Sequence, residues 1–274
     1  MKTVDVGGAR IPALGFGTWQ LEGDDCRAGV ENALDLGYRH IDTAQIYGNE
    51  AEVGEAIQAS EVAREDIWLT TKVWYERATA AQVKSSTEES LRKLRTGYVD
   101  LLLFHWPNDR VELKETLGAM NELREQGLAK HIGVSNFTPT LLKQALEIAP
   151  VRALQCEYHP FLAQKELIAL CAASDMMFTA YSPLARGEVL EDPTLRLIAE
   201  RHGKSTVQVV LRWLVDQPHV AAVPKASSEA HRRANFDIFD FSLTDADVAA
   251  IDGLARGQRI IDPGFAPKWE NASA

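Results

Sequence analysis

Cysteine is scarce in this sequence, and the usual metal-binding patterns are missing. The 274 residues include only Cys26, Cys156 and Cys171, an odd number without CxxC spacing. This argues against a disulfide framework or a cysteine-rich zinc site and favours reduced thiols in the cytoplasm. The seven histidines are dispersed and no H-E-x-x-H motif occurs, so we expect no metal.

The chain also lacks a long hydrophobic run and an excess of positive charge. No run of about 18 apolar residues occurs, so the sequence predicts no membrane span. The first residues, MKTVDVGGAR, contain no apolar segment of the signal-peptide kind. A formal net charge of −10 makes nucleic acid an unfavourable partner. We therefore expect a cytoplasmic monomer whose partner is a small molecule.

What the sequence does contain is a regular alternation of short β-like runs and longer helical patterns. Apolar residues between the runs recur three and four positions apart, as on a helix that packs against a sheet. Eight such units and no linker rich in Pro, Gly or Ser predict a single α/β domain over residues 1–274, a (β/α)8 TIM barrel. The strand candidates are residues 13–18, 39–44, 67–73, 99–105, 130–136, 153–159, 177–183 and 220–226.

Additional segments flank this alternation. The start, TVDVGGARIPAL, predicts a β-hairpin that turns at Gly7 and Gly8. The long seventh crossover predicts two helices, and LTDADVAAIDGL predicts a further helix with Thr244 as N-cap and Asp247 completing a capping box. A doubly wound open sheet is the alternative fold. For a dinucleotide it would require G-x-G-x-x-G after the first strand, and LGFGTWQ does not supply that pattern.

Polar side chains stand at the ends of several predicted strands, where the chemistry of a barrel is located. Asp42 ends the second strand and Tyr47 follows in the loop. Lys72 lies near the end of the third strand, and an ammonium buried there requires a partner such as Asp42. His105 ends the apolar run DLLLFH. Each residue alone has an ordinary structural explanation, but their convergence at one end of a barrel predicts an active site.

A series of short motifs along nearly the whole chain resembles, in type and order, the motifs of the aldo-keto reductases. They are GFGTW, RHIDTAQIYGNE, TTKVW, LLLFHWP, IGVSNF, LQCEYHP, YSPLARG, VPK and ANF, and the tail APKWE is similar to bacterial members of the 2,5-diketo-D-gluconic acid reductase type. The resemblance implies a (β/α)8 barrel that reduces carbonyls with a nicotinamide cofactor and without a metal.

By the same resemblance, Asp42, Tyr47, Lys72 and His105 match the catalytic residues of the family. Tyr47 is then the general acid that gives its proton to the developing alkoxide. A phenol has a pKa of about 10, and we expect Lys72 to lower it, with Asp42 holding Lys72 in place. His105 is expected to orient the substrate oxygen.

The resemblance also implies a set of cofactor-binding residues. Ser135, Asn136 and Gln155 match those that bind the nicotinamide carboxamide, and Tyr181 matches the aromatic residue beneath the ring. The full set is Gly17, Thr18, Trp19, Ser135, Asn136, Gln155, Tyr181, Ser182, Leu184, Lys225, Ser227, Ser228, His231 and Asn235.

One position departs from the family pattern at the adenosine end of the cofactor. The family usually places an arginine six residues after the lysine, whereas this chain has His231. Arg232 and Arg233 follow it but point about 100° and 200° further round a helix. Lys225, Ser227 and Ser228 favour NADPH, and the neutral histidine leaves NADH open because it binds phosphate less strongly than arginine does.

Three tryptophans, Trp19, Trp74 and Trp106, are predicted to form an aromatic wall for the substrate, with Phe161 as a further candidate. The tail 256–274 is expected to add a wall, and Arg186 and Arg259 are candidates for binding acidic substrates. In the family such pockets accept small aldehydes, dicarbonyls of the methylglyoxal type and keto-sugars.

Two other classes of protein are weighed against this prediction. A short-chain dehydrogenase requires lysine four residues after tyrosine, and no tyrosine here has it. The remaining alternative is a non-catalytic regulatory barrel that binds a nicotinamide cofactor.

Overall fold

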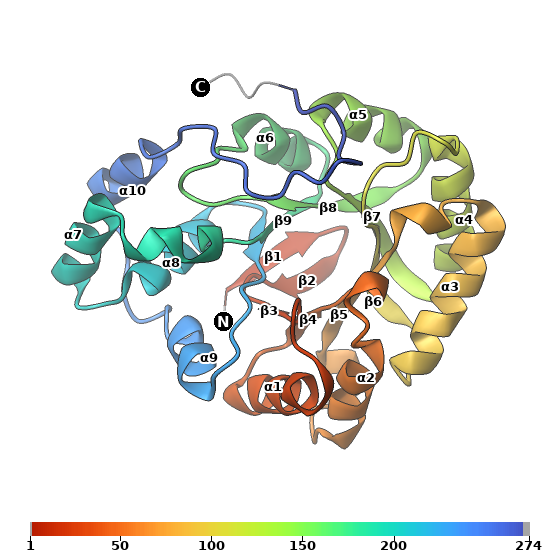
Figure 1. Cartoon of the computed structure of the whole chain (residues 1–274), viewed down its shortest axis with the longest axis horizontal. Coiled ribbons are helices and arrows are strands. Elements are labelled where there is room, and N and C mark those ends of the chain that lie inside the picture. The colour runs from red at the N-terminus through yellow and green to blue at the C-terminus, as the bar shows by residue number, and fades with distance from the viewer. Residues whose placement is uncertain (1, 271–274) are drawn as a thin grey trace.

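The computed structural model describes residues 2–270 and shows eight parallel strands surrounded by helices (Figure 1). The strands are β3 (Phe16–Gly17), β4 (His40–Asp42), β5 (Trp68–Val73), β6 (Val99–Phe104), β7 (Ala129–Ser135), β8 (Val151–Glu157), β9 (Met177–Tyr181) and β10 (Val220–Ala222), and they pair in sequence order. Hydrogen bonds from Gly15 to the Ala222 carbonyl and from Gly17 to the Pro224 carbonyl join the first strand to the last. The (β/α)8 barrel predicted from the sequence is therefore confirmed.

The helices between the strands bury one apolar stripe each against the sheet, as their three- and four-residue periodicity requires. They are α1 (Gly23–Leu36), α2 (Glu50–Ala59), α3 (Ala80–Lys93), α4 (Leu113–Glu125), α5 (Pro139–Ile148), α6 (Lys165–Ala173), α7 (Pro193–His202) and α8 (Thr206–Asp216). Two further helices, α9 (Glu229–Phe236) and α10 (Asp245–Asp252), follow the last strand. Short 3-10 turns precede or interrupt them at η1 (Gln45–Tyr47), η2 (Arg64–Asp66), η3 (Tyr75–Arg77) and η4 (Ala185–Leu190). Among the described residues, no helix is long and apolar enough to cross a membrane.

The additional elements also lie where the sequence predicts them. The hairpin β1 (Thr3–Val6) and β2 (Ala9–Pro12) turns at Gly7 and Gly8, which both have positive φ. The seventh crossover contains α7 and α8, and α10 begins with the capping box of Thr244 and Asp247.

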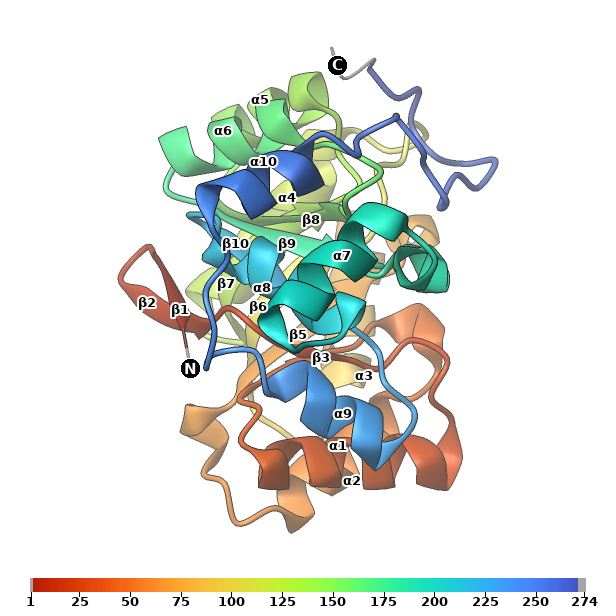
Figure 2. The same cartoon turned by 90° about the vertical axis from the view of Figure 1, so that its left-hand side faces the viewer.

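The hairpin and the C-terminal tail lie at opposite ends of the barrel (Figure 2). Val6 and Ile11 of the hairpin border the same small void as Trp68, Leu101 and Ala153, which lie near the amino ends of their strands. The hairpin therefore closes the amino end. The carboxyl ends of the strands remain open to the loops that follow them.

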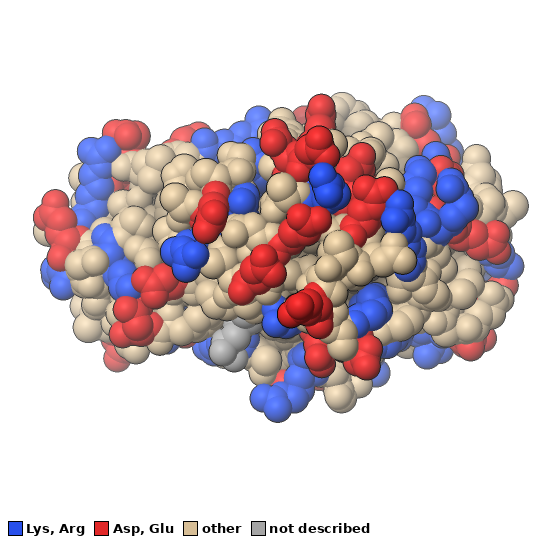
Figure 3. Space-filling view, turned by 90° about the horizontal axis from the view of Figure 1, so that it is seen from below, with Lys and Arg blue, Asp and Glu red and all other residues tan. Residues whose placement is uncertain are grey.

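Charged side chains of both signs share the face seen in Figure 3, with acidic groups gathered toward its middle. No broad basic patch appears on that face. This distribution agrees with the net charge of −10 and gives a polyanion no obvious surface there.

Candidate active site

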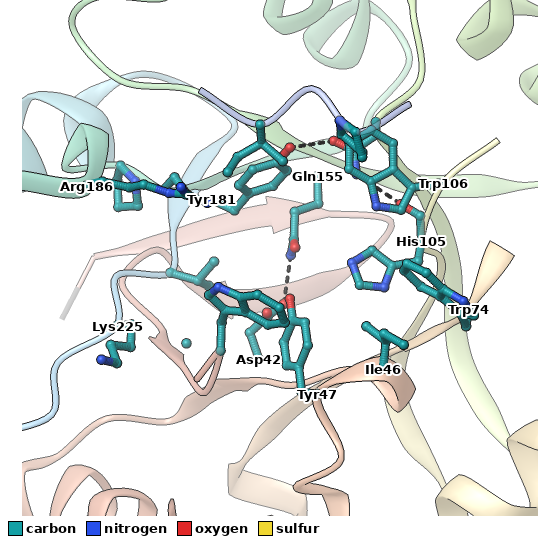
Figure 4. Close-up of a pocket in the computed structure, with 18 of the residues that line it drawn as sticks. Asp42, Ile46, Tyr47, Trp74, His105, Trp106, Gln155, Tyr181, Arg186 and Lys225 are labelled. Atoms are coloured by element: carbon teal, nitrogen blue, oxygen red, sulfur yellow. Dashed lines mark hydrogen bonds between the residues drawn. The ribbon is translucent and has the colours of Figure 1, made fainter. Parts of the chain in front are cut away.

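Asp42, Tyr47 and His105 line the pocket at the carboxyl end of the barrel (Figure 4), and Lys72 contacts Asp42 and Tyr47 without lining it. Asp42 ends β4, Tyr47 ends the 3-10 turn η1, Lys72 lies in β5 and His105 follows β6. Gly48 has φ 72°, which lets the chain leave η1 and enter α2 while the Tyr47 side chain remains beside the barrel opening.

Lys72 is completely buried and has three oxygen partners. Its Nζ donates to Asp42 Oδ1 at 2.6 Å and to the Thr43 carbonyl at 2.8 Å, and lies 3.3 Å from the Tyr47 hydroxyl. Burial alone lowers the pKa of Lys72, but the Asp42 carboxylate and Tyr47 outweigh it and hold the pKa above its ordinary value. The ammonium therefore stays charged inside the barrel.

The pKa of the Tyr47 phenol lies above its ordinary value, although Lys72 lowers it as expected from the sequence. Burial raises the pKa, the nearby Lys72 lowers it and Asp42 raises it again, so that burial decides the net direction. The charge of Lys72 therefore offsets only part of the effect of burial on the Tyr47 pKa. In the free protein Tyr47 is thus a protonated phenol next to a cation.

His105 is a neutral imidazole at the inner wall of the pocket. Its ring lies 5.8 Å from the Tyr47 ring and 5.4 Å from the Trp74 ring, measured between centroids. Burial and the charge of Lys72 hold its pKa well below the ordinary value. Its Nδ1 atom is buried and finds no hydrogen-bond partner among residues 2–270.

Asn49 holds the Tyr47 loop in place, and sequence reasoning did not assign it a role. Its side chain accepts from the Thr43 hydroxyl at 2.8 Å and donates to the carbonyls of Thr18 and Leu21 at 2.9 Å each. The loop after β4 is thereby tied to the loop after β3. The only signal in the sequence is a polar residue directly after Gly48.

The residues predicted to bind the nicotinamide end lie next to the catalytic candidates. Asn136 is buried, with φ 62°, and its side chain donates to the His105 carbonyl and accepts from the Tyr181 hydroxyl at 2.6 Å. Gln155 lines the pocket and donates to Asp42 Oδ2 at 2.7 Å. Ser135 is buried behind Asn136 and donates to the Gln155 carbonyl.

Gly17 lies at the seam of the barrel and lines the pocket. A Cβ atom on it would meet the Val223 carbonyl oxygen at 2.7 Å, so only glycine fits. Thr18 is buried and donates to the Asp42 carbonyl, and Leu184 packs on the core without lining the pocket. Ser182 lines the pocket with φ 47°, a left-handed conformation that costs energy in a non-glycine residue.

The residues predicted for the adenosine end lie farther along the same side. Lys225 lines the pocket, whereas Ser227, Ser228 and His231 at the start of α9 and Asn235 near its end lie outside the pocket lining. His231 is exposed, and its backbone N–H donates to the Ser228 side chain. Asn235 is buried.

Neither of the neighbouring arginines takes the place of the missing one. Arg232 is buried and bound to Asn32 and to the carbonyls of Ala226 and Ser227, while exposed Arg233 lies 3.3 Å from Glu229. They turn away from the His231 position, as the helical geometry predicts.

The rest of the pocket wall is aromatic and aliphatic. Trp19, Trp74 and Trp106 line it, together with Ile46 and Phe265. Trp19 lies 4.9 Å from Tyr47, and Phe265 lies 5.6 Å from Trp74 and 5.5 Å from Trp106, between ring centroids. The C-terminal tail contributes Ile261, Pro263 and Phe265 to this wall.

Two of the substrate-side expectations are wrong. Phe161 is 1% exposed and lies under the Arg256 guanidinium instead of at the pocket, because its backbone binds the tail. Arg259 lies 3.5 Å from the Trp269 ring, outside the pocket lining. Arg186 does line the pocket, on the side of Lys225 and Tyr181 (Figure 4).

A parallel barrel whose carboxyl end gathers a phenol, an ammonium and a carboxylate in an aromatic cleft belongs to the class of barrel oxidoreductases. The model of the aldo/keto reductase family matches residues 13–256. This chain belongs to that family, whose chemistry is carbonyl reduction with a nicotinamide cofactor.

Individual relatives agree with this assignment. Methylglyoxal reductase DkgB of Salmonella typhi is 39% identical over 95% of this chain and 99% of its own length. Aldo-keto reductase family 1 member A1 of Xenopus tropicalis is 37% identical over 93% of this chain and 89% of its own. A crystal structure of a candidate 2,5-diketo-D-gluconic acid reductase B shares 48% identity and a TM-score of 0.97, covering 99% of this chain and 98% of that chain.

Proposed function

We propose that this protein reduces aldehydes, ketones or dicarbonyls of the methylglyoxal or keto-sugar type to alcohols, with NADPH as the hydride donor. The observation that carries the proposal is the Tyr47 hydroxyl 3.3 Å from a fully buried Lys72 ammonium that Asp42 holds at 2.6 Å. Carbonyl reduction requires a proton donor beside the carbonyl oxygen, and this arrangement supplies one.

Tyr47 has the properties required of that donor. Because burial raises its pKa, the phenol is protonated when the substrate arrives. As the proton moves to the substrate oxygen, the phenolate that forms faces the Lys72 ammonium in a site of low dielectric, where the charge pair is strongly favourable. Lys72 thus acts on the phenolate formed during the reaction more than on the resting phenol.

His105 is suited to orient the carbonyl. A neutral imidazole can donate one hydrogen bond to the substrate oxygen, and its low pKa keeps it neutral. The unpaired Nδ1 leaves the His105 ring with unused hydrogen-bonding capacity, and this ring lies next to Tyr47.

The residues around the cleft fit a nicotinamide cofactor. When bound, the cofactor supplies the hydride. Tyr181 offers a flat aromatic face, Asn136 and Gln155 offer amide groups, and Lys225 and Arg186 offer positive charge farther along the cleft. Among these, the amide of Asn136 is already oriented by His105 and Tyr181, so it is held ready for a ligand.

The test is steady-state turnover of NADPH and, separately, NADH with methylglyoxal, glyceraldehyde and 4-nitrobenzaldehyde. We expect oxidation of NADPH with all three and a lower kcat/KM with NADH. Tight NADPH binding without turnover of any carbonyl would contradict the proposal and favour a regulatory barrel. A clear NADH preference would contradict the choice of cofactor alone.

A further inference from the structure

Another buried carboxylate lies outside the Lys72 group and reaches the pocket wall through the backbone of Ile261. Glu157 is the last residue of β8 and is completely buried. Its Oε1 accepts from the backbone N–H of Ile260 at 2.7 Å, and its Oε2 accepts from that of Ile261 at 2.9 Å. One side chain thus binds two consecutive amides of the tail, more than 100 residues away in the sequence.

His159 completes this carboxylate site. Its Nε2 lies 2.9 Å from Glu157 Oε1, and its Nδ1 accepts from the backbone N–H of Phe161 at 3.3 Å. Because Nδ1 accepts, the proton of a neutral ring is on Nε2, which donates to Glu157. Burial raises the pKa of the Glu157 carboxyl, but these hydrogen bonds outweigh burial and leave the pKa below its ordinary value. Glu157 is therefore a fully satisfied buried anion.

The tail has no helix or strand to fix its course. Residues 254–270 follow α10 without regular secondary structure, and the dark blue tail passes close to β8 in Figure 1. Besides Glu157, the carbonyl of Phe161 binds the amides of Arg256 and Gln258. The hydrogen bond from Ile261 to Glu157 lies where the tail enters the pocket wall, shortly before Pro263 and Phe265.

From this arrangement we infer that Glu157 is a positioning residue for substrate binding: by holding the tail at Ile260 and Ile261 it places the Ile261–Phe265 wall over the pocket. The inference rests on the proposed function, since it concerns how the same pocket selects its substrate. Glu157 acts only through the tail, so it governs KM and selectivity instead of the proton step. A substrate large enough to reach Phe265 depends on it more than a three-carbon substrate does.

The experiment compares Glu157→Gln with wild type on 4-nitrobenzaldehyde and methylglyoxal. The amide can accept from only one of the two tail N–H groups, so one hydrogen bond is lost and a buried donor is left unpaired. We expect KM for 4-nitrobenzaldehyde to rise about tenfold, KM for methylglyoxal to change less than about threefold, and kcat and the Kd of NADPH to remain near the wild-type values.

The matched control is Asp100→Asn. Asp100 is also buried and accepts from the Leu69 amide, near Arg64 and Lys130, but at the amino end of the barrel. Its variant should lose stability without changing either KM. A purely structural role of Glu157 would make Glu157→Gln behave like this control, with both KM values unchanged. That result, or an equal rise in both KM values, would overturn the inference.

A second comparison uses the double variant Glu157→Gln/Phe265→Ala. If Glu157 works through the wall, its effect on KM should largely disappear once Phe265 is removed, whereas independent effects would multiply and overturn the inference. If Glu157→Gln does not fold, hydrogen exchange of the wild-type protein tests the inference. Slow exchange at the Ile260 and Ile261 amides supports stable hydrogen bonds to Glu157, and fast exchange refutes them. Absence of wild-type turnover would instead refute the proposed function and leave the exchange result readable.

Discussion

Gln155 donates a 2.7 Å hydrogen bond to Asp42 Oδ2, while the other oxygen of Asp42 binds Lys72. The carboxylate is thus held from both sides, by β8 and by β5. A residue expected to bind the cofactor therefore also orients the group that keeps Lys72 charged. This relationship links cofactor binding and proton chemistry through one side chain.

Replacing Tyr47 by Phe removes the proposed proton donor. We expect kcat for carbonyl reduction to fall by about 100-fold or more, because general acid catalysis contributes that much. Binding of NADPH, measured by quenching of tryptophan fluorescence, should persist. Tyr75→Phe is the matched control, since Tyr75 stacks on Phe265 and, within residues 2–270, its hydroxyl donates only to Glu76. Near wild-type kcat in Tyr47→Phe would remove it from the acid role.

Replacing Lys72 by Met should cost both activity and stability. The substitution leaves Asp42 as an uncompensated buried charge, which typically destabilises by about 3–5 kcal/mol. Urea denaturation gives the free energy of unfolding. In the double variant Lys72→Met/Asp42→Asn we expect much of the stability to return but no activity. Equal stability of the single and double variants would argue against a coupled pair.

Stability should decline as the pH falls below about 6.5, the ordinary pKa of histidine. Burial lowers the pKa of His40, His105 and His131, so the unfolded chain binds more protons than the folded protein below that pH. The stabilisation is fully present above about pH 6.5 and is lost as pH decreases, by up to about 1.4 kcal/mol per pH unit for each group. Urea denaturation of wild type and His105→Gln between pH 7 and 5 measures this. The variant should show a shallower decline, and parallel curves would contradict the assignment to His105.

The cofactor preference should respond to His231. This exposed residue occupies the position where the family usually has arginine, at the start of α9. His231→Arg should raise kcat/KM for NADPH about tenfold through a charge-assisted contact with the additional phosphate, with little change for NADH. Arg233→Gln is the control, because Arg233 faces Glu229 and should leave both values unchanged. An equal gain with NADH would show that the 2′-phosphate is not bound there.

Much of the fold and the centre of the site could be predicted from the sequence because the barrel topology determines where the strand-end residues lie. Asp42, Lys72 and His105 are strand-end residues, and parallel strands bring their ends together. Tyr47 follows Asp42 too closely to leave that end. Glu157 ends a buried strand as Asp42 does, so the same reasoning applied there would have found it.

The wall of the pocket could not be predicted in the same way. Phe265 belongs to a tail without periodicity. Its place depends on the hydrogen bonds of the preceding tail residues to Glu157 and on the contacts of its ring with Trp74 and Trp106. Phe161 is a further candidate for this wall from the sequence, yet in the structure its ring lies under the Arg256 guanidinium. The direction of the Tyr47 pKa shift likewise depended on how burial and two opposite charges balance, which spacing along the chain does not reveal.

The seam between Gly17 and Pro224 has a consequence for biosynthesis. The cleft takes side chains from Gly17 at one end of the chain to Phe265 near the other, and the ring closes only when β10 meets β3. A ribosome must therefore synthesise the chain at least as far as Phe265 before the cleft is complete. Until then the hydrophobic interior is exposed, so a stalled or truncated product of this gene would be a substrate for chaperones and proteases instead of a partially active enzyme.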